Sequence, residues 1–187
     1  MNTRLMENFV EEPFLSTVTR EHSIWQENQD CSATWKDEIG NTFGVYKPPS
    51  LWPLVQYCQL KLVGMFDCEL VNTYWYSQLY FRESFMVPHT DRSPCEISLS
   101  INLWYDETYP YEWYLHVWDD RSHTYEAYAT KPGDALLYDG IKNSHWRSNY
   151  MGKGYQQVFV HFVRKDGECF NTDETQKAID LEGPHFD

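Results

Sequence analysis

The stretch EISLSINLW, residues 96–104, alternates apolar and polar side chains along its length. Successive side chains of a strand point to opposite faces of a sheet, so this period of two predicts a strand with one face in the core. Similar short runs surround it, at VNTYWYSQLYF (71–81), EWYLHVW (112–118), TYEAYAT (124–130), DALLYD (134–139), SHWRSNYM (144–151) and YQQVFVHFV (155–163). Many short strands separated by turn residues are typical of a double-sheet jelly roll. The sequence therefore predicts a mainly β fold, a jelly roll with a few flanking helices.

The chain of 187 residues is expected to form a single domain, 1–187, because that length suffices for one sizeable core. The predicted strands occupy residues 70–165 and form this core. Residues 1–69 are an N-terminal flank of mixed polar composition with no clean period. Residues 164–187 form a polar, acidic C-terminal tail, which we expect to be a loosely packed end or a lid.

The segment LWPLVQYCQLKLV, residues 51–63, predicts a helix within the N-terminal flank. Ser50 is expected to cap it, Pro53 stands in its first turn and Gly64 follows its end. The residues before Ser50 are left without an assigned element.

The composition bears on partners and location. A formal net charge of −13, with no visible basic patch, would repel nucleic-acid phosphates, so no nucleic-acid partner is expected. No stretch approaches transmembrane length, and the first residues, MNTRLMENFVEEPF, contain no sustained apolar run. We therefore expect a soluble, cytoplasmic protein without a membrane partner, whose partner is a small-molecule or peptide substrate. The sequence leaves the oligomeric state open.

The cysteines are scattered and include no CxxC pair, which argues against a zinc ribbon and against a disulfide framework. They are Cys31, Cys58, Cys68, Cys95 and Cys169. Buried or surface thiols are therefore the expected state.

The series His89-Thr90-Asp91, followed in the same β-rich region by His145, supplies two imidazoles and one carboxylate. On an extended strand His89 and Asp91 point to the same side, and Thr90 points away. Two histidines and one carboxylate occupy one face of an octahedral Fe(II) and leave the other positions open for a co-substrate and O₂. An isolated HxD is common, and Asp91 alone could be a turn or surface carboxylate. The run of short strands before His145 favours the metal site.

Further residues form an ordered series around this set: Tyr80 before the HxD pair, the segment KPGDALLYDG (131–140) before His145, and the closing strand 155–163. The series, over roughly residues 70–165, resembles the Fe(II)/2-oxoglutarate-dependent oxygenases, most closely the prolyl 4-hydroxylase branch. The resemblance implies a double-stranded β-helix that holds Fe(II) by His89, Asp91 and His145, with 2-oxoglutarate and O₂ as co-substrates. It also implies a hydroxylase that acts on a C–H bond of an amino acid or a peptide and releases succinate and CO₂.

One residue departs from the pattern of that family. The basic residue that pairs with the distal carboxylate of 2-oxoglutarate usually starts the last strand, where this chain has Tyr155. A carboxylate buried in a barrel without a cation is costly, so we expect another cation there. Arg147 is the first choice, since it lies two residues beyond His145 and would face inward beside it. Lys153, in a turn between two glycines, is the second.

The family resemblance also suggests that Tyr80 contacts the co-substrate. The last strand alternates, so if Tyr155 faces inward then Gln157 does too, where it could hydrogen-bond the co-substrate beside Tyr80. The ordinary alternatives stay open: Arg147 as a salt-bridged surface residue and Tyr80 as a core aromatic. His161, if it faces inward with Gln157, would lie near the iron, although a hydrogen-bonded core histidine is the more frequent role for such a residue.

Other polar and aromatic residues receive weaker expectations. Arg92 is either solvated or directed toward an acidic substrate, and His116 and His123 are taken as structural. Trp113 and Trp118 are expected on the pocket wall, which would favour a small substrate.

Two other functional classes remain open. A cupin-like metal protein, whether an isomerase, a dioxygenase or a sensor, shares the jelly roll but does not use 2-oxoglutarate. Cupins usually offer HxH with Glu, whereas this chain has HxD. A binding module that has lost activity is the third class, and the complete ligand set argues against it because a buried carboxylate without a metal is unfavourable.

Overall fold

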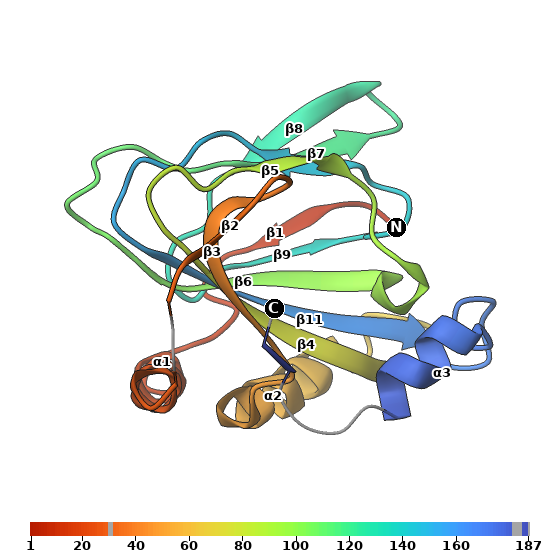
Figure 1. Cartoon of the computed structure of the whole chain (residues 1–187). Coiled ribbons are helices and arrows are strands. Elements are labelled where there is room, and N and C mark those ends of the chain that lie inside the picture. Colours follow the sequence, from red (N-terminus) through yellow and green to blue (C-terminus); the bar gives the residue numbers. More distant parts are fainter. Residues whose placement is uncertain (30–31, 181–184, 187) are drawn as a thin grey trace.

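The computed structural model describes residues 1–29, 32–180 and 185–186, and its strands form two antiparallel sheets that face each other (Figure 1). The larger sheet has the order β1 (Arg4–Met6), β9 (Ala135–Tyr138), β6 (Ile97–Tyr105), β11 (Tyr155–Arg164), β4 (Leu70–Tyr80), β3 (Gly40–Tyr46) and β12 (His185–Phe186), and β2 (Thr34–Lys36) pairs with β3. The smaller sheet has the order β5 (Met86–His89), β10 (His145–Arg147), β7 (Leu115–Asp119) and β8 (Thr124–Tyr128). The predicted mainly β jelly roll is confirmed.

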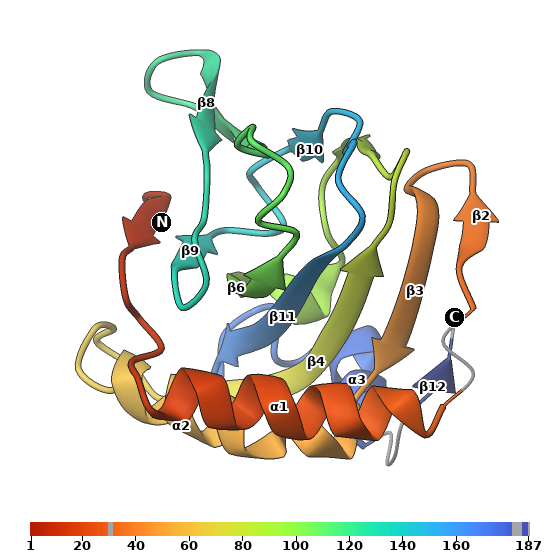
Figure 2. The ribbon, with the colours of Figure 1, turned by 90° about the vertical axis from the view of Figure 1, so that its left-hand side faces the viewer.

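The helices are α1 (Phe14–Glu27), α2 (Trp52–Leu62) and α3 (Asp173–Asp180), with short 3₁₀ turns at Pro49–Leu51 and Ser93–Cys95. Figure 2 shows α1 and α2 side by side against the outer face of the larger sheet. Helix α2 lies within the range 51–63, but its N-cap is Leu51. The Ser50 hydroxyl instead lies 2.8 Å from Nδ1 of His22, so the predicted Ser50 cap is wrong.

The N-terminal flank and the tail hold more structure than their sequences indicate. Strands β1, β2 and β3 and helix α1 lie within residues 1–69, and all three strands join the larger sheet. Helix α3 of the tail packs on β4, and Lys47 Nζ donates a hydrogen bond to the Ala178 carbonyl at 2.7 Å. Of the two expectations for the tail, a loosely packed end is therefore wrong for α3, and a lid stays a prediction.

Strand β6 shows how the barrel is filled. Ile97, Leu99 and Ile101 pack in the core beneath α1 and α2, as the alternation predicts. The polar residues between them are fully buried as well, because they face the space between the two sheets. There the Ser98 hydroxyl lies 2.9 Å from Nδ1 of His161, and Ser100 Oγ accepts a hydrogen bond from Gln157. The inside of the barrel thus has a polar, hydrogen-bonded part along β6 and β11, beside an apolar cluster that both sheets contribute to.

The cysteines within the described ranges, Cys58, Cys68, Cys95 and Cys169, are free, and Cys31 lies outside those ranges. Across residues 1–29, 32–180 and 185–186, no helix is both long and apolar enough to cross a membrane.

His22 joins α1 to the sheet and makes stability depend on pH. Its ring nitrogens contact the hydroxyls of Ser50 and Ser77, and burial lowers its pKa to about 4. Between pH 4 and pH 6.5 the unfolded chain therefore binds a proton that the folded chain rejects, so stability is complete above pH 6.5 and falls toward pH 4. This histidine contributes a slope of about 1.4 kcal/mol per pH unit in that window.

His22→Gln is expected to reduce the pH slope of the free energy of unfolding by about that amount, as measured by urea denaturation between pH 4.5 and pH 6.5. The exposed His123→Gln serves as the matched control. Equal slopes in wild type and His22→Gln would contradict the assignment.

Candidate metal centre

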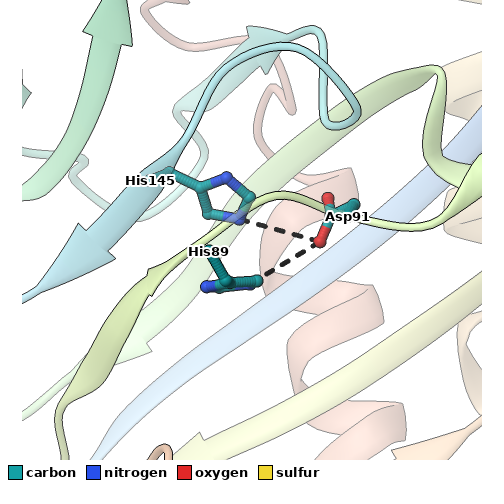
Figure 3. Close-up of side chains that lie close together, drawn as sticks. All are labelled: His89, Asp91 and His145. Atoms are coloured by element: carbon teal, nitrogen blue, oxygen red, sulfur yellow. Dashed lines mark ion pairs between the residues drawn. The ribbon is translucent and has the colours of Figure 1, made fainter.

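His89, Asp91 and His145 meet where β5 and β10 pair (Figure 3). His89 ends β5, His145 begins β10, and the two residues are register partners. Asp91 lies just beyond β5, and its backbone N–H donates to the Gly140 carbonyl at 2.8 Å. Oδ1 of Asp91 lies 3.7 Å from Nε2 of His89 and 3.8 Å from Nε2 of His145. The structure thus brings together the three ligands that the sequence predicts.

Both imidazoles have a fixed orientation. Nδ1 of His89 lies 2.9 Å from the Val87 carbonyl, and Nδ1 of His145 lies 2.9 Å from the Asn143 carbonyl. A carbonyl only accepts, so Nδ1 carries the proton in each ring and the lone pair of Nε2 points toward Asp91. Metal-binding histidines usually have this arrangement.

The Asp91 carboxylate completes the donor set. Its Oδ2 is buried and has no hydrogen-bond partner among the described residues, which leaves an uncompensated acceptor. Burial raises the pKa of Asp91 and lowers the pKa of His145 to about 4, so His145 is neutral at pH 7. Two imidazoles with their Nε2 atoms directed at one carboxylate that needs a cation fit a divalent metal such as Fe(II).

A cavity of about 600 Å³ opens beside the three residues. Its lining includes Tyr80, Tyr138 and His161. Aromatic side chains from β3, β4 and β11 form another wall of the same cavity. His161 is hydrogen-bonded to Ser98 and also faces the cavity, so it combines a core contact with a place near the metal ligands. Neither Arg147 nor Gln157 lines the cavity.

Arg147 lies immediately behind the cavity wall, with a side chain that is 2% exposed. It donates to the Trp113 carbonyl at 3.0 Å and to Oε1 of Gln157 at 3.4 Å, and its Nε has no partner among the described residues. The guanidinium forms no ion pair with any described carboxylate, although its positive charge lowers the pKa values of Tyr80 and Tyr138, against the larger effect of burial. A buried, uncompensated cation therefore stands next to the cavity.

The other candidates for the distal carboxylate of a co-substrate are placed differently. Lys153 is exposed and lies outside the cavity lining. Tyr155, at the start of β11, is buried with its hydroxyl 2.8 Å from that of Thr130. Both amide ends of Gln157 contact protein, because Oε1 accepts from Arg147 and Nε2 donates to Ser100.

The pocket wall is not where the sequence places it. The Trp113 ring, whose centre lies 4.3 Å from the guanidinium carbon of Arg147, lines a smaller second cavity of about 130 Å³. Trp118 donates a hydrogen bond to Asp120 at the surface. Neither tryptophan lines the main cavity, so the predicted wall is wrong. The residues that sequence reasoning missed are Tyr46, Tyr74, Tyr76, Glu174 and Lys177. A period of two counted back along β4 from Tyr80 would have found Tyr76 and Tyr74.

Gly140 allows the Asp91 carboxylate its position. A Cβ at residue 140 would lie 2.5 Å from Oδ2 of Asp91 and 2.5 Å from the Cys95 carbonyl. Both contacts are too short for a real Cβ, and the second is with backbone, so Gly140→Ala must displace the Asp91 carboxylate or the main chain around it.

We expect Gly140→Ala to weaken Fe(II) binding by roughly 10- to 100-fold, the range found when the support of a metal ligand is disturbed. Anaerobic Fe(II) titration measures this, and Gly64→Ala, at an open site with no neighbour near the added carbon, is the comparison. Wild-type iron affinity in the Gly140 variant would show that Asp91 does not depend on this glycine.

No family model matches the chain, and no curated protein matches it at sequence level. Solved structures do match. A Pseudomonas putida prolyl-4-hydroxylase aligns with a TM-score of 0.63 and 13% identity, over 87% of this chain and 92% of that one.

A prolyl hydroxylase from Trichoplax adhaerens, in complex with a hypoxia inducible factor oxygen degradation domain peptide fragment, aligns with a TM-score of 0.66 and 12% identity. The alignment covers 96% of this chain and 87% of that one. HygX from Streptomyces hygroscopicus, with nickel and 2-oxoglutarate bound, aligns with a TM-score of 0.62 and 10% identity, over 87% of this chain and 82% of that one. At such identities the likeness concerns the fold. The predicted resemblance is confirmed at that level: the chain has the jelly-roll fold of the prolyl hydroxylases and other 2-oxoglutarate/Fe(II) oxygenases.

Proposed function

We propose that this protein is an Fe(II)- and 2-oxoglutarate-dependent dioxygenase that hydroxylates a C–H bond of an amino acid or a peptide. The observation that carries the proposal is the cluster of His89, Asp91 and His145 beside the cavity of a jelly roll. Two oriented Nε2 atoms and a carboxylate whose buried Oδ2 has no hydrogen-bond partner in the described part of the chain form the donor set that such an iron requires.

The roles of the metal ligands follow from this geometry. His89, Asp91 and His145 would hold the iron, and His89, with 38% of its side chain exposed, lies on the open side. Iron, 2-oxoglutarate and O₂ together supply the oxidising power, with release of succinate and CO₂. The chain itself keeps His145 neutral, fixes the tautomers of both histidines and holds the carboxylate between them.

A second group of residues suits the co-substrate. We assign the distal carboxylate of 2-oxoglutarate to Arg147, the buried cation without a carboxylate partner in the described chain. Gln157 holds the guanidinium in place rather than contacting the co-substrate. Burial raises the pKa of Tyr80 to about 12, so its hydroxyl stays protonated and can donate to 2-oxoglutarate from the cavity wall.

The cupin-like alternative does not explain why Arg147 is buried beside the cavity. A metal protein that does not bind 2-oxoglutarate would keep a buried cation at a cost and with no carboxylate partner in the described chain. This observation favours the oxygenase. The cytoplasmic location and the absence of a nucleic-acid partner stay predictions from the sequence.

The deciding experiment is anaerobic addition of Fe(II) to the apoprotein with and without 2-oxoglutarate, followed by visible absorption. We expect the charge-transfer band of an iron-chelated keto acid, and we expect His145→Ala to lose it. Iron binding without the band would favour the cupin-like protein, and failure to bind iron would refute the metal site.

A further inference from the structure

One wall of the main cavity consists of aromatic rings. Tyr46 and Tyr74 stack with centroids 5.0 Å apart, and Tyr74 lies 4.5 Å from the ring of His161. Phe159 is nearly parallel to His161, at an interplanar angle of 9°, and Tyr76 also lines this wall. Such a wall offers ring faces and edges for stacking, which favours a flat aromatic ligand over an aliphatic one.

The wall begins at the metal ligands. A ligand atom of His161 lies within 4.8 Å of an Asp91 carboxylate oxygen, and Tyr74 contacts His161. Arg147 and Tyr80 lie together in another part of the barrel, where Tyr80 packs against Trp113. The ring wall therefore lies in a different part of the barrel from Arg147, so a substrate on the wall and 2-oxoglutarate on the Arg147 side would not overlap.

The rim above this wall carries both signs of charge. Arg92, directly after Asp91, lies 6.0 Å from the centre of the Tyr74 ring and pairs with Glu174 at 3.3 Å. Lys177 lines the same cavity and forms no ion pair within the described part of the chain. The rim therefore presents two cations and one carboxylate within reach of a ligand that lies on the rings.

Helix α3 holds two of these charges in place. Figure 1 shows α3 at the end of β4 and β11. Lys47 Nζ donates to the carbonyls of Ala178 and Ile179, and Thr175 is fully buried. Glu174 and Lys177 are three residues apart and so share one face of the helix, the face that borders the cavity.

Building on the proposed function, we propose that the substrate is a free amino acid with an aromatic side chain. Its ring lies on the wall of Tyr46, Tyr74, Tyr76 and Phe159. Its carboxylate meets Lys177 and Arg92, and its ammonium meets Glu174. A residue within a peptide chain lacks both charges and would leave the rim unused.

The test measures binding, by anaerobic calorimetry, to protein loaded with Fe(II) and 2-oxoglutarate. The probes are L-phenylalanine, 3-phenylpropionate without the ammonium, phenethylamine without the carboxylate, L-leucine without the aromatic ring, and N-acetyl-L-phenylalanine amide without either charge. L-phenylalanine is expected to bind best, roughly tenfold more tightly than L-leucine. The charge-transfer band in the same sample reports separately whether the proposed function holds.

Variants separate the two charges. Lys177→Gln should weaken the binding of L-phenylalanine and of 3-phenylpropionate by roughly three- to tenfold and leave the affinity for phenethylamine unchanged. Glu174→Gln should weaken the binding of L-phenylalanine and of phenethylamine to a similar extent, without weakening the binding of 3-phenylpropionate. Lys131→Gln, an exposed lysine outside the main cavity, is the matched control and should change none of the three affinities.

The outcomes are distinct. The expected pattern of probes and variants supports an aromatic amino acid. A normal band with no binding of L-phenylalanine, or with equal binding of the N-acetyl amide or of L-leucine, overturns the inference and leaves the oxygenase proposal standing. Absence of the band overturns the proposed function and this inference with it.

Discussion

Asp91→Ala is expected to abolish Fe(II) binding, with a loss of affinity greater than the roughly 100-fold that disturbing the support of a ligand produces. The Asp91 carboxylate lies close to both Nε2 atoms, so its removal leaves the two imidazoles without an anionic donor between them. The apoprotein should be no less stable than wild type, because the lost Oδ2 is buried without a hydrogen-bond partner among the described residues. Anaerobic iron titration and thermal unfolding of the apoprotein together check both statements.

His145→Ala should likewise lose iron binding, and His116→Ala is its matched control. His116 lies on the adjacent strand β7, paired with Trp146, and stacks on that ring outside the cavity lining. Iron affinity at wild-type level in Asp91→Ala or His145→Ala, or an equal loss in His116→Ala, would contradict the assigned ligand set.

Arg147→Met is expected to weaken 2-oxoglutarate binding by roughly 30- to 1,000-fold, the effect of removing one partner of a buried charge pair. Iron affinity should stay within a few-fold of wild type, since Arg147 contacts Trp113 and Gln157 rather than a metal ligand. Methionine keeps most of the length of the side chain and its packing on Trp113 while removing the charge. Calorimetry with Fe(II)-loaded protein measures the co-substrate, and iron titration measures the metal.

Lys153→Met is the competing variant. It should leave 2-oxoglutarate affinity unchanged, because Lys153 is exposed and its backbone N–H binds Asp106 in a surface turn. If Lys153→Met loses affinity and Arg147→Met does not, the distal carboxylate is bound at Lys153.

The sequence predicts those parts of the molecule in which side-chain period and burial agree. Residues 96–104 follow the period of two along β6, and the HxD spacing places His89 and Asp91 on one side of the chain. The distant His145 could be placed only through a family resemblance, because its pairing with His89 depends on register between strands that are far apart in the sequence.

The missed helices lack the usual apolar stripe. Helix α1 buries Leu15, Val18, His22 and Gln26, and half of this set is polar. Helix α3 buries Thr175 and Ala178, which are small or polar, so its sequence has no apolar period that would predict a helix. Their polar positions find partners only in the folded protein, as His22 does with Ser50 and Ser77. Trp113 is buried as the alternation indicates, but it lies before the start of β7 and packs with Tyr150 and Tyr155 instead of lining the main cavity.

Helix α3 brings residues from the end of the chain to the cavity. The metal ligands and Arg147 come from residues 86–147, whereas Glu174 and Lys177 reach the cavity from a helix that packs on β4 and is hydrogen-bonded to Lys47. Under the proposed roles, sequence changes in α3 can alter the contacts of a substrate without changing the proposed metal ligands. This part of substrate recognition is therefore able to diverge separately from the metal centre.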